Sequence, residues 1–249
     1  MLKEERKRLI LNEVRIHNRV LLTDMAETVK VSVDTIRRDV IELDKEQKLK
    51  RVHGGAISLG FYNGPVFEKE VYAIEDKINI AKKSIELIKD GQVILLSGGT
   101  TNYELARLMP AHLKITCFTP SLPIAQQLLV KNNIEVILIG GKLSKDSQIT
   151  IGGTAINMLT DIKVDICFLG SNSLHPDHGI TEFDWEIVEM KKAMIKSSKM
   201  VISPTISEKI GNPKRFKICD IQDIDTLITE LPPDAPQLKA FRNKGIRLL

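Results

Sequence analysis

Two groups of residues in this chain have the types and the spacing needed for molecular recognition. The first is the segment SVDTIRRDV at 32–40, where small hydroxyl residues are followed by the adjacent pair Arg37 and Arg38. On a helix, this order places hydroxyl groups at the N-terminal end and cations on the flank. A helix that enters the DNA major groove has this pattern, with base edges near its N-terminus and phosphates beside the cations. The segment therefore indicates recognition of duplex DNA.

The second group is the run Ser97, Gly98, Gly99, Thr100 and Thr101, which directly follows four apolar residues. Glycines let a bound anion approach the backbone, while hydroxyls and the free amides of a helix N-terminus donate hydrogen bonds to it. The run is the strongest candidate in the chain for a phosphate cradle. Ordinary turn and helix-capping chemistry uses the same residues, so both interpretations stay open at this point.

The elements around the first group follow from apolar spacing. The pattern predicts a helix from about residue 2 to 17 and a second over 22–29 with Thr23 as its N-cap. A tight turn at 30–32 then leads into a third helix, capped by Ser32. Residues 48–57 indicate two short strands around a turn. Together these elements predict a winged helix-turn-helix.

A less specific interpretation exists for the arginine pair. A short helix followed by an amphipathic helix is common, and Asp34, Asp39 and Glu42 lie near enough in sequence to make Arg37 and Arg38 an ordinary solvated face. The charge distribution favours DNA, because residues 1–57 carry 13 lysines and arginines against 10 aspartates and glutamates, a net +3. The other 192 residues carry 23 against 22, a net +1. The basic excess therefore lies where the DNA would bind.

The rest of the chain alternates strands and helices. A helical pattern over 74–88 precedes apolar runs of strand length, several of them followed by a loop rich in Gly, Ser or Thr and then a helix. The expected strands are 93–96, 114–118, 134–139, 164–169 and 200–203. This order predicts an α/β fold with a parallel sheet, in which the loops at the carboxyl ends of the strands gather in one ligand-binding crevice.

Length and composition limit the other possibilities. With 249 residues, 43% hydrophobic and 27% charged, we expect a DNA-binding domain over 1–57, a linker over 58–73 and an effector-sensing α/β domain over 74–249. No run reaches the roughly 18 apolar residues of a membrane span, and the N-terminus lacks a signal-peptide core, so we expect a cytoplasmic protein without membrane partners.

The cysteines and aromatic residues narrow the chemistry further. Cys117, Cys167 and Cys219 lie far apart in or beside apolar runs, which predicts buried thiols rather than a metal site or a disulfide framework. With one Trp and three Tyr, stacking on single-stranded nucleic acid is not indicated. We expect no metal and no cofactor.

The first group and its flanks carry a family resemblance. The run from Arg6 to Leu43, with SVDTIRRDVIEL at 32–43 and the wing RVHGGA at 51–56, resembles the N-terminal signature of the DeoR family of bacterial transcription regulators. The resemblance implies binding to a double-stranded operator. The residues that it places on the DNA side are Ser32, Thr35, Arg37 and Arg38 on the helix and His53 in the wing.

The resemblance extends along residues 74–230. The segments DGQVILLSGGTTNYELA, FTPSLPIAQQL, VILIGGKLS, DICFLGSNSL and GITEFDWEIVEMKKAM are similar to successive blocks of the DeoR effector domain. That domain has a fold related to ribose phosphate isomerase and binds phosphorylated sugars or similar metabolites, so the same is expected here. The effector residues so implied are Ser97, Gly98, Gly99, Thr100 and Thr101, helped by Thr119 and Ser121, with Gly140, Gly141 and Lys191 in matching blocks. Lys191 fits a surface position near Glu186 or Glu189 equally well.

Three positions depart from the family pattern. Many members read Asp Ser Gly Thr Thr where this chain has Ser97 to Thr101, and Thr Asn Ser where it has Thr119, Pro120 and Ser121. The usual Asp Ser Ser Lys stretch is replaced by Ser203 to Lys209, about two residues longer. The phosphate end of the site is kept, while the end that would identify the sugar is altered.

These observations favour a transcription regulator, a repressor of a sugar-metabolism operon that acts as a homodimer or homotetramer. The alternative is a phosphosugar isomerase or hydrolase with a fused helical domain. Its candidate bases would be Asp165, His175, Asp177, His178, Glu182 and Asp184. None of them has a partner spacing that singles it out, so we assign no catalytic residue and expect no enzyme.

Overall fold

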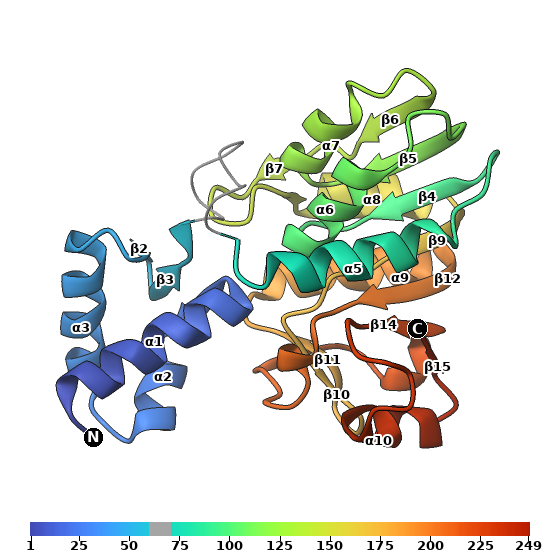
Figure 1. Cartoon of the computed structure of the whole chain (residues 1–249). Helices are drawn as coiled ribbons and strands as arrows, with labels where there is room; N and C mark the ends of the chain where they lie inside the picture. The colour runs from blue at the N-terminus through green and yellow to red at the C-terminus, as the bar shows by residue number, and fades with distance from the viewer. Residues whose placement is uncertain (60–70) are drawn as a thin grey trace. The chain divides into compact units, whose positions relative to one another are not determined.

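The computed structural model describes residues 1–59 and 71–249, and most of the expected linker, 60–70, lies outside the described residues. The chain divides into two compact units, Met1–Tyr72 and Ala73–Leu249 (Figure 1). Each unit has its own apolar core. They are therefore described one at a time.

Unit 1 is the expected winged helix-turn-helix. Its elements are α1 (Lys3–His17), β1 (Arg19–Leu21), α2 (Leu22–Val29), α3 (Val33–Lys45), β2 (Lys50–Val52) and β3 (Gly55–Ile57). The apolar stripes of the three helices meet in one core, with Ile10, Ile36 and Val40 fully buried. Periodicity thus located all three helices correctly.

The wing differs from the expected pair of strands. A third strand, β1, pairs with β3 and gives a three-stranded antiparallel sheet in the order β1-β3-β2. β1 ends at Leu21 and α2 begins at Leu22, so Leu21 is the N-cap of α2. Leu22 N donates to Gly54 O at 2.9 Å, which joins the start of α2 to the wing. The prediction of Thr23 as the N-cap was therefore wrong. A Cβ on Gly55 would lie 2.1 Å from Val20 O, so only glycine permits this close pairing.

Unit 2 is built on a seven-stranded parallel sheet in the order β15-β14-β12-β9-β4-β5-β6. The strands are β4 (Val93–Leu96), β5 (Ile115–Thr119), β6 (Ile134–Leu138), β9 (Val164–Phe168), β12 (Ser198–Pro204), β14 (Thr226–Ile228) and β15 (Arg247–Leu248). The five strands expected from sequence are adjacent in this sheet. The α/β fold class with an N-terminal winged helix-turn-helix is thereby confirmed.

The order of these strands reverses beside β4. From β4 the chain moves outward through β5 to β6, and it then returns to the other side of β4 with β9. In open α/β sheets a ligand binds outside the carboxyl ends of the strands at such a reversal. The sheet topology therefore points to the loops that follow β4 and β9.

Helices and smaller strand pairs complete unit 2 (Figure 1). The helices are α5 (Ile74–Ile85), α6 (Thr100–Leu108), α7 (Leu122–Leu128), α8 (Gly153–Thr160), α9 (Trp185–Lys196) and α10 (Lys239–Asn243), with short 3-10 turns η2 (Ser207–Lys209), η3 (Ile221–Asp223) and η4 (Pro236–Leu238). The antiparallel pieces are the hairpin β7 (Lys142–Leu143) with β8 (Thr150–Ile151), and the sheet of β10 (Ser173–His175), β11 (Gly179–Glu182) and β13 (Phe216–Cys219). All three cysteines are free and buried, as expected. Among the described residues, none of the helices has the length and apolarity to cross a membrane.

Candidate functional site

The start of α3 is fixed by its own hydroxyl groups. Lys30 adopts a left-handed conformation (φ 54°) that ends α2, and Ser32 Oγ then caps α3 by accepting from Thr35 N at 3.2 Å. The hydroxyls of Ser32 and Thr35 lie 2.9 Å apart. Ser32 was correctly predicted as the cap. The two hydroxyls mark the exposed N-terminal end of the helix, where base contacts are made in helix-turn-helix proteins.

The arginine pair lies on the exposed face of α3. Arg37 and Arg38 are both exposed, and both contact Asp34: Arg37 through an ion pair and Arg38 through a bond from Nε to the Asp34 carbonyl at 3.4 Å. A DNA phosphate would have to displace the Asp34 carboxylate from Arg37, whereas Arg38 has no ion pair with Asp34. Arg38 is therefore the arginine of this pair whose charge is the more available to DNA.

Asp39 does not belong to that face. It is 1% exposed, and its carboxylate accepts from Arg6 of α1 twice, from Nε to Oδ2 and from Nη2 to Oδ1, the latter at 3.1 Å. The hydrogen bonds that Arg6 donates to Asp39 raise the pKa of Arg6. The idea that Asp39 helps to make the arginine pair an ordinary solvated surface was wrong. The carboxylate instead fastens the candidate recognition helix to α1.

Other acidic residues of α3 are also paired away from the arginines. Lys7 forms ion pairs with Glu42 and Glu46 at 2.8 and 3.1 Å, and Lys3 joins Glu42 at 2.7 Å. Hydrogen bonds from Lys3 and Lys7 lower the pKa of Glu42 to about 2. These carboxylates are therefore neutralised by α1, which leaves the positive charge of α3 on its exposed face.

The wing adds one cation that sequence reasoning missed. His53 is exposed in the turn between β2 and β3, as the resemblance implied, and Arg51 on β2 is exposed as well. The alternation of the strand could have revealed it, because Arg51 is the outward position between Lys50 and Val52. The wing thus presents Arg51 and His53 together.

The second predicted site lies at the carboxyl end of β4. Ser97 is buried, and its Oγ accepts from Gly170 N at 2.7 Å and from Asn102 Nδ2 at 3.0 Å. Gly99 (φ 111°) is the N-cap of α6 and makes no side-chain cap hydrogen bond. Open space surrounds the position of its missing Cβ. The first amides of α6, at Thr100 and Thr101, therefore border a space that an anion can approach.

Thr119 ends the neighbouring strand β5, Ser121 follows it, and both lie beside this loop. Thr119 Oγ1 donates to Leu96 O at 2.8 Å and accepts from Ser121 N at 3.1 Å. Ser121 Cβ lies 3.9 Å from the position a Cβ on Gly98 would take. The structure therefore brings Ser97 to Thr101 and Thr119 to Ser121 together at one edge of the sheet.

Three of the glycines have different surroundings. A Cβ on Gly98 would lie 2.6 Å from Ile149 Cγ2 of the segment between β7 and β8, and one on Gly141 (φ 145°) would lie 2.9 Å from Ile151 O. Close packing of the β7–β8 hairpin explains both glycines without a ligand. Gly140 is exposed and has open space at its Cβ position. Gly140 and Gly141, which directly precede β7, remain predicted effector contacts only.

Lys191 is not the surface residue that its sequence neighbours suggested. It is buried on α9, and its Nζ lies 2.8 Å from Glu182 Oε2. Glu186 and Glu189 pair instead with Lys142 and Lys192.

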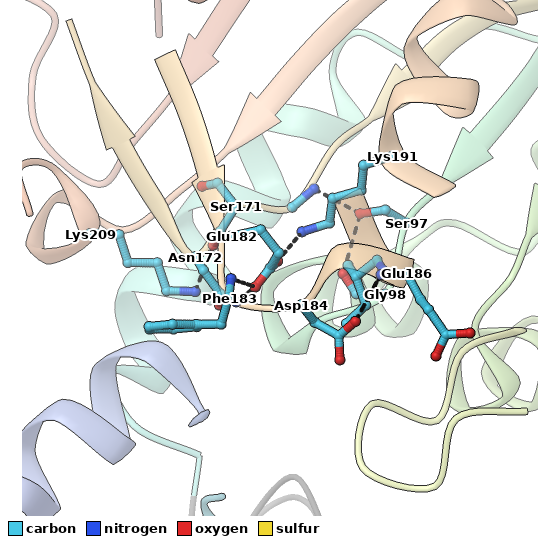
Figure 2. Close-up of polar contacts among 12 residues, drawn as sticks. Ser97, Gly98, Ser171, Asn172, Glu182, Phe183, Asp184, Glu186, Lys191 and Lys209 are labelled. Carbon is cyan, nitrogen blue, oxygen red and sulfur yellow. Dashed lines mark hydrogen bonds and ion pairs between the residues drawn. The ribbon is translucent and has the colours of Figure 1, made fainter. Parts of the chain in front are cut away.

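Glu182 is held by several donors at once. Beside Lys191, the side-chain amide of Asn172 and the backbone amide of Phe183 donate to its Oε1 (Figure 2). Burial opposes ionisation of this carboxyl, but the charge of Lys191 and these hydrogen bonds hold its pKa below the ordinary value. The group is therefore a fixed anion.

Two buried lysines were missed by sequence reasoning. Lys209, in η2, donates from Nζ to Ser171 O at 3.0 Å, and burial with the charges of Lys77 and Lys191 lowers its pKa to about 7 against the opposing charge of Glu182. Lys77 of α5 is 0% exposed, and burial lowers its pKa to about 8. Lys77 lies four residues before Ala81 on the apolar face of α5, a pattern that also fits a lysine whose ammonium reaches water.

Three consecutive residues after β9 connect these parts. Gly170 N bonds Ser97 of the candidate phosphate loop, Ser171 O bonds Lys209, and Asn172 bonds Glu182. Because two residues of extended chain span about 7 Å, the loop, the Glu182–Lys191 pair and Lys209 surround one small region. It lies where the strand order reverses. We call it the switch-point site.

The other candidate bases have structural roles. Asp165, at the amino end of β9, accepts from Val93 N and pairs with Lys199. Asp177 pairs with Lys244, His175 Nδ1 accepts backbone amides of its own turn, and Asp184 caps α9. Within residues 1–59 and 71–249, no three His, Cys, Asp or Glu side chains are placed to hold a metal ion.

Known families and proteins resemble both units. A family model described as a DeoR-like helix-turn-helix domain matches residues 6–60, and one described as the DeoR C terminal sensor domain matches residues 72–231. The HTH-type transcriptional repressor GlcR of Bacillus subtilis (strain 168) is 31% identical, covering 100% of this chain and 96% of the relative. The glycerol-3-phosphate regulon repressor of Escherichia coli (strain K12) is 29% identical, covering 100% and 99%. Ribose 5 phosphate isomerase A from Neisseria gonorrhoeae, at 13% identity, matches with a TM-score of 0.41 over 55% of this chain and 53% of that one.

Proposed function

The chain belongs to the DeoR family of transcriptional regulators, and from this premise we propose that it represses a sugar-metabolism operon under the control of a phosphorylated sugar bound in unit 2. The relatives include the regulon repressor for glycerol 3-phosphate named above, which supports the class of target. The observation that carries the proposal is the switch-point site, a buried cationic region beside a glycine and hydroxyl loop.

We propose that α3 reads the operator. The hydroxyls of Ser32 and Thr35 lie at its N-terminal end, and Arg37 and Arg38 lie on its exposed face. Phosphate contacts position such a helix, while its N-terminal residues contact base edges. Arg51 and His53 of the wing extend the same proposal to the neighbouring backbone.

The effector's phosphate is proposed to bind the loop from Ser97 to Thr101. The free amides at the start of α6 and the hydroxyls of Thr100 and Thr101 donate to it, and Lys191 adds positive charge. Glu182 accepts hydrogen bonds from sugar hydroxyls. Because Glu182 is already held by Lys191, Asn172 and Phe183 N, it is poorly suited to take a proton in catalysis, which supports binding without turnover.

Coupling between effector binding and operator affinity needs two protomers and two arrangements of them. We propose that a homodimer or homotetramer places two α3 helices on adjacent half-sites and that the ligand favours one arrangement of them over the other. Binding at the switch-point site then changes operator affinity. A two-fold protein fits a palindromic or repeated operator.

The DNA part is tested by salt dependence. A duplex is selected from a random-sequence pool with the full chain, and its affinity is measured by fluorescence anisotropy between 50 and 200 mM salt, a range over which phosphate contacts are strongly screened. For Arg38→Ala we expect weaker binding and a slope of log K against log salt that is shallower by about 0.9 for each DNA phosphate that the variant no longer neutralises.

The matched control is Arg247→Ala, which removes the same charge from an exposed position in unit 2. We expect this control to leave both the affinity and the slope unchanged. If Arg38→Ala behaves like Arg247→Ala, and Arg37→Ala does too, α3 is not the DNA-binding surface. The effector part is tested by adding phosphorylated sugars to the same complex, where release of the duplex by none of them would contradict it.

A further inference from the structure

Lys209 is a buried cation with an incomplete set of partners. Its side chain carries three donor protons, and its Nζ donates to a single protein acceptor, the carbonyl of Ser171 at 3.0 Å. In the part of the chain that the structure describes, no carboxylate forms an ion pair with it. Burying a charge without a counter-charge is unfavourable, so the position is suited to an anion supplied from outside the protein.

The charged groups around Lys209 make its lack of a counter-charge more unfavourable. They come from three elements: Lys77 on α5, Lys191 on α9 and Glu182 on β11. Glu182 is the acid whose charge acts on Lys209, but it already bonds Lys191 at 2.8 Å. The charge of Lys209 is therefore not balanced by this carboxylate, and both neighbouring lysines oppose it.

Lys209 and the phosphate loop contact adjacent residues of one segment. Gly170 N bonds Ser97 Oγ of the loop, and the carbonyl of the next residue, Ser171, bonds Lys209. Figure 2 shows the Glu182–Lys191 pair between Lys209 and the loop residues Ser97 and Gly98 in this view. Adjacent residues have Cα atoms about 3.8 Å apart, so the loop and Lys209 contact neighbouring points of the same segment and can contact one small ligand.

We infer that the effector carries two anionic groups, a phosphate held by the loop from Ser97 to Thr101 and a carboxylate held by Lys209, and is therefore a phosphorylated sugar acid. The inference rests on the proposed function, because it assumes that the loop binds the phosphate. A carboxylate completes the hydrogen bonds of the Lys209 ammonium and supplies its missing counter-charge. Glu182 and Asn172, between the two ends, are left to bind hydroxyl groups.

Two pairs of probes test this directly. Sorbitol 6-phosphate and 6-phosphogluconate share an open six-carbon chain and a phosphate and differ at carbon 1, and glycerol 3-phosphate and 3-phosphoglycerate form a shorter pair of the same kind. Dissociation constants are measured by calorimetry with the full chain and with Lys209→Met, which replaces the ammonium by an apolar group of similar length. The fluorescence of Trp185 reports whether each variant is folded.

In the wild type we expect the acid of at least one pair to bind roughly tenfold or more tightly than its partner, as a charge-assisted hydrogen bond provides. In folded Lys209→Met this preference should disappear, while affinity for the partner without a carboxylate stays within about threefold. Lys209→Arg, which keeps the charge, should retain part of the preference.

The possible outcomes test the second anionic position and the phosphate loop separately. Phosphates that bind without preference for the acid, or a preference that survives in Lys209→Met, overturn the second anionic position and leave the proposed function intact. Failure of all four compounds to bind overturns the phosphate loop itself, and the inference with it.

Discussion

Replacement of Asp39 by asparagine should release the candidate recognition helix from α1. Asp39 is buried, and its carboxylate accepts hydrogen bonds from both Nε and Nη2 of Arg6, whose side chain is 10% exposed. Asparagine preserves the shape, but it offers one acceptor oxygen and no charge. The guanidinium of Arg6 would then remain buried beside a neutral amide.

The expected decrease in stability follows from this geometry. Removing one partner of a buried ion pair costs about 3–5 kcal/mol, and because one acceptor and a partial path to water remain, we expect about 3 kcal/mol. Unit 1 comprises residues Met1–Tyr72, and a domain of that size has about 4–10 kcal/mol of stability at typical values per residue. The substitution would lower its melting temperature by roughly 12–24 °C.

The two units can be followed separately in the full chain. Its single tryptophan, Trp185, belongs to unit 2, so tryptophan fluorescence reports that unit alone, whereas circular dichroism at 222 nm includes the helices of unit 1. In urea, Asp39→Asn should produce an early circular dichroism transition with the Trp185 transition unchanged. Affinity for a selected duplex should fall under the same conditions.

The control is the same substitution at Asp34, on the same helix. Its side chain is 74% exposed, so Asp34→Asn should change stability by less than about 0.5 kcal/mol. Asp39→Asn that unfolds within that margin of the wild type would refute the view that the Arg6–Asp39 pair positions α3.

Three further outcomes follow from unit 2. Because the pKa of Lys209 is lowered to about 7 and an anion prefers the charged form, affinity for 6-phosphogluconate should fall as pH rises from 6.5 to 8.5, and calorimetry should show a weaker fall in Lys209→Met, where Lys77 (pKa about 8) still titrates nearby. Gly179→Ala should cost about 3 kcal/mol in the Trp185 urea transition, since its φ is +70° and a Cβ would lie 1.9 Å from Cys219 O, whereas Gly91→Ala (φ +82°, open space) should cost about 1 kcal/mol. Burial raises the pKa of the Cys117 thiol, so it should react with a thiol reagent at pH 8 only after urea is added.

Local pattern was enough to predict much of the architecture. The helices of unit 1 and the five central strands of unit 2 carry their periodicity within short segments, so they could be located from sequence. The β7–β8 hairpin could not, because its strands have two residues each and are held by contacts such as Thr150 N to Pro120 O at 2.8 Å, thirty residues away. The burial of Asp39 likewise depends on Arg6, 33 residues earlier.

Buried lysines are hard to predict for a different reason. A lysine on an apolar helix face usually keeps its ammonium in water by extending its long stem, so Lys77 on α5 and Lys209 after β12 are consistent with surface positions until the fold is known. In the structure both are buried, and Lys191 with them. The position of the switch-point site could be predicted from its loop. The buried lysines that give the site its charge could not be predicted.

The departures from the family pattern change the charge of the switch-point site in the same sense. Many DeoR members carry an aspartate where this chain has Ser97, and here the serine holds Gly170 N and Asn102 by neutral hydrogen bonds. The stretch from Ser203 to Lys209 also begins with a serine where many members have an aspartate, and it keeps the final lysine, which is buried here. Both changes omit a negative charge, so both make the site more favourable to anions. An effector with more negative charge than a simple sugar phosphate is the ligand that would benefit from both.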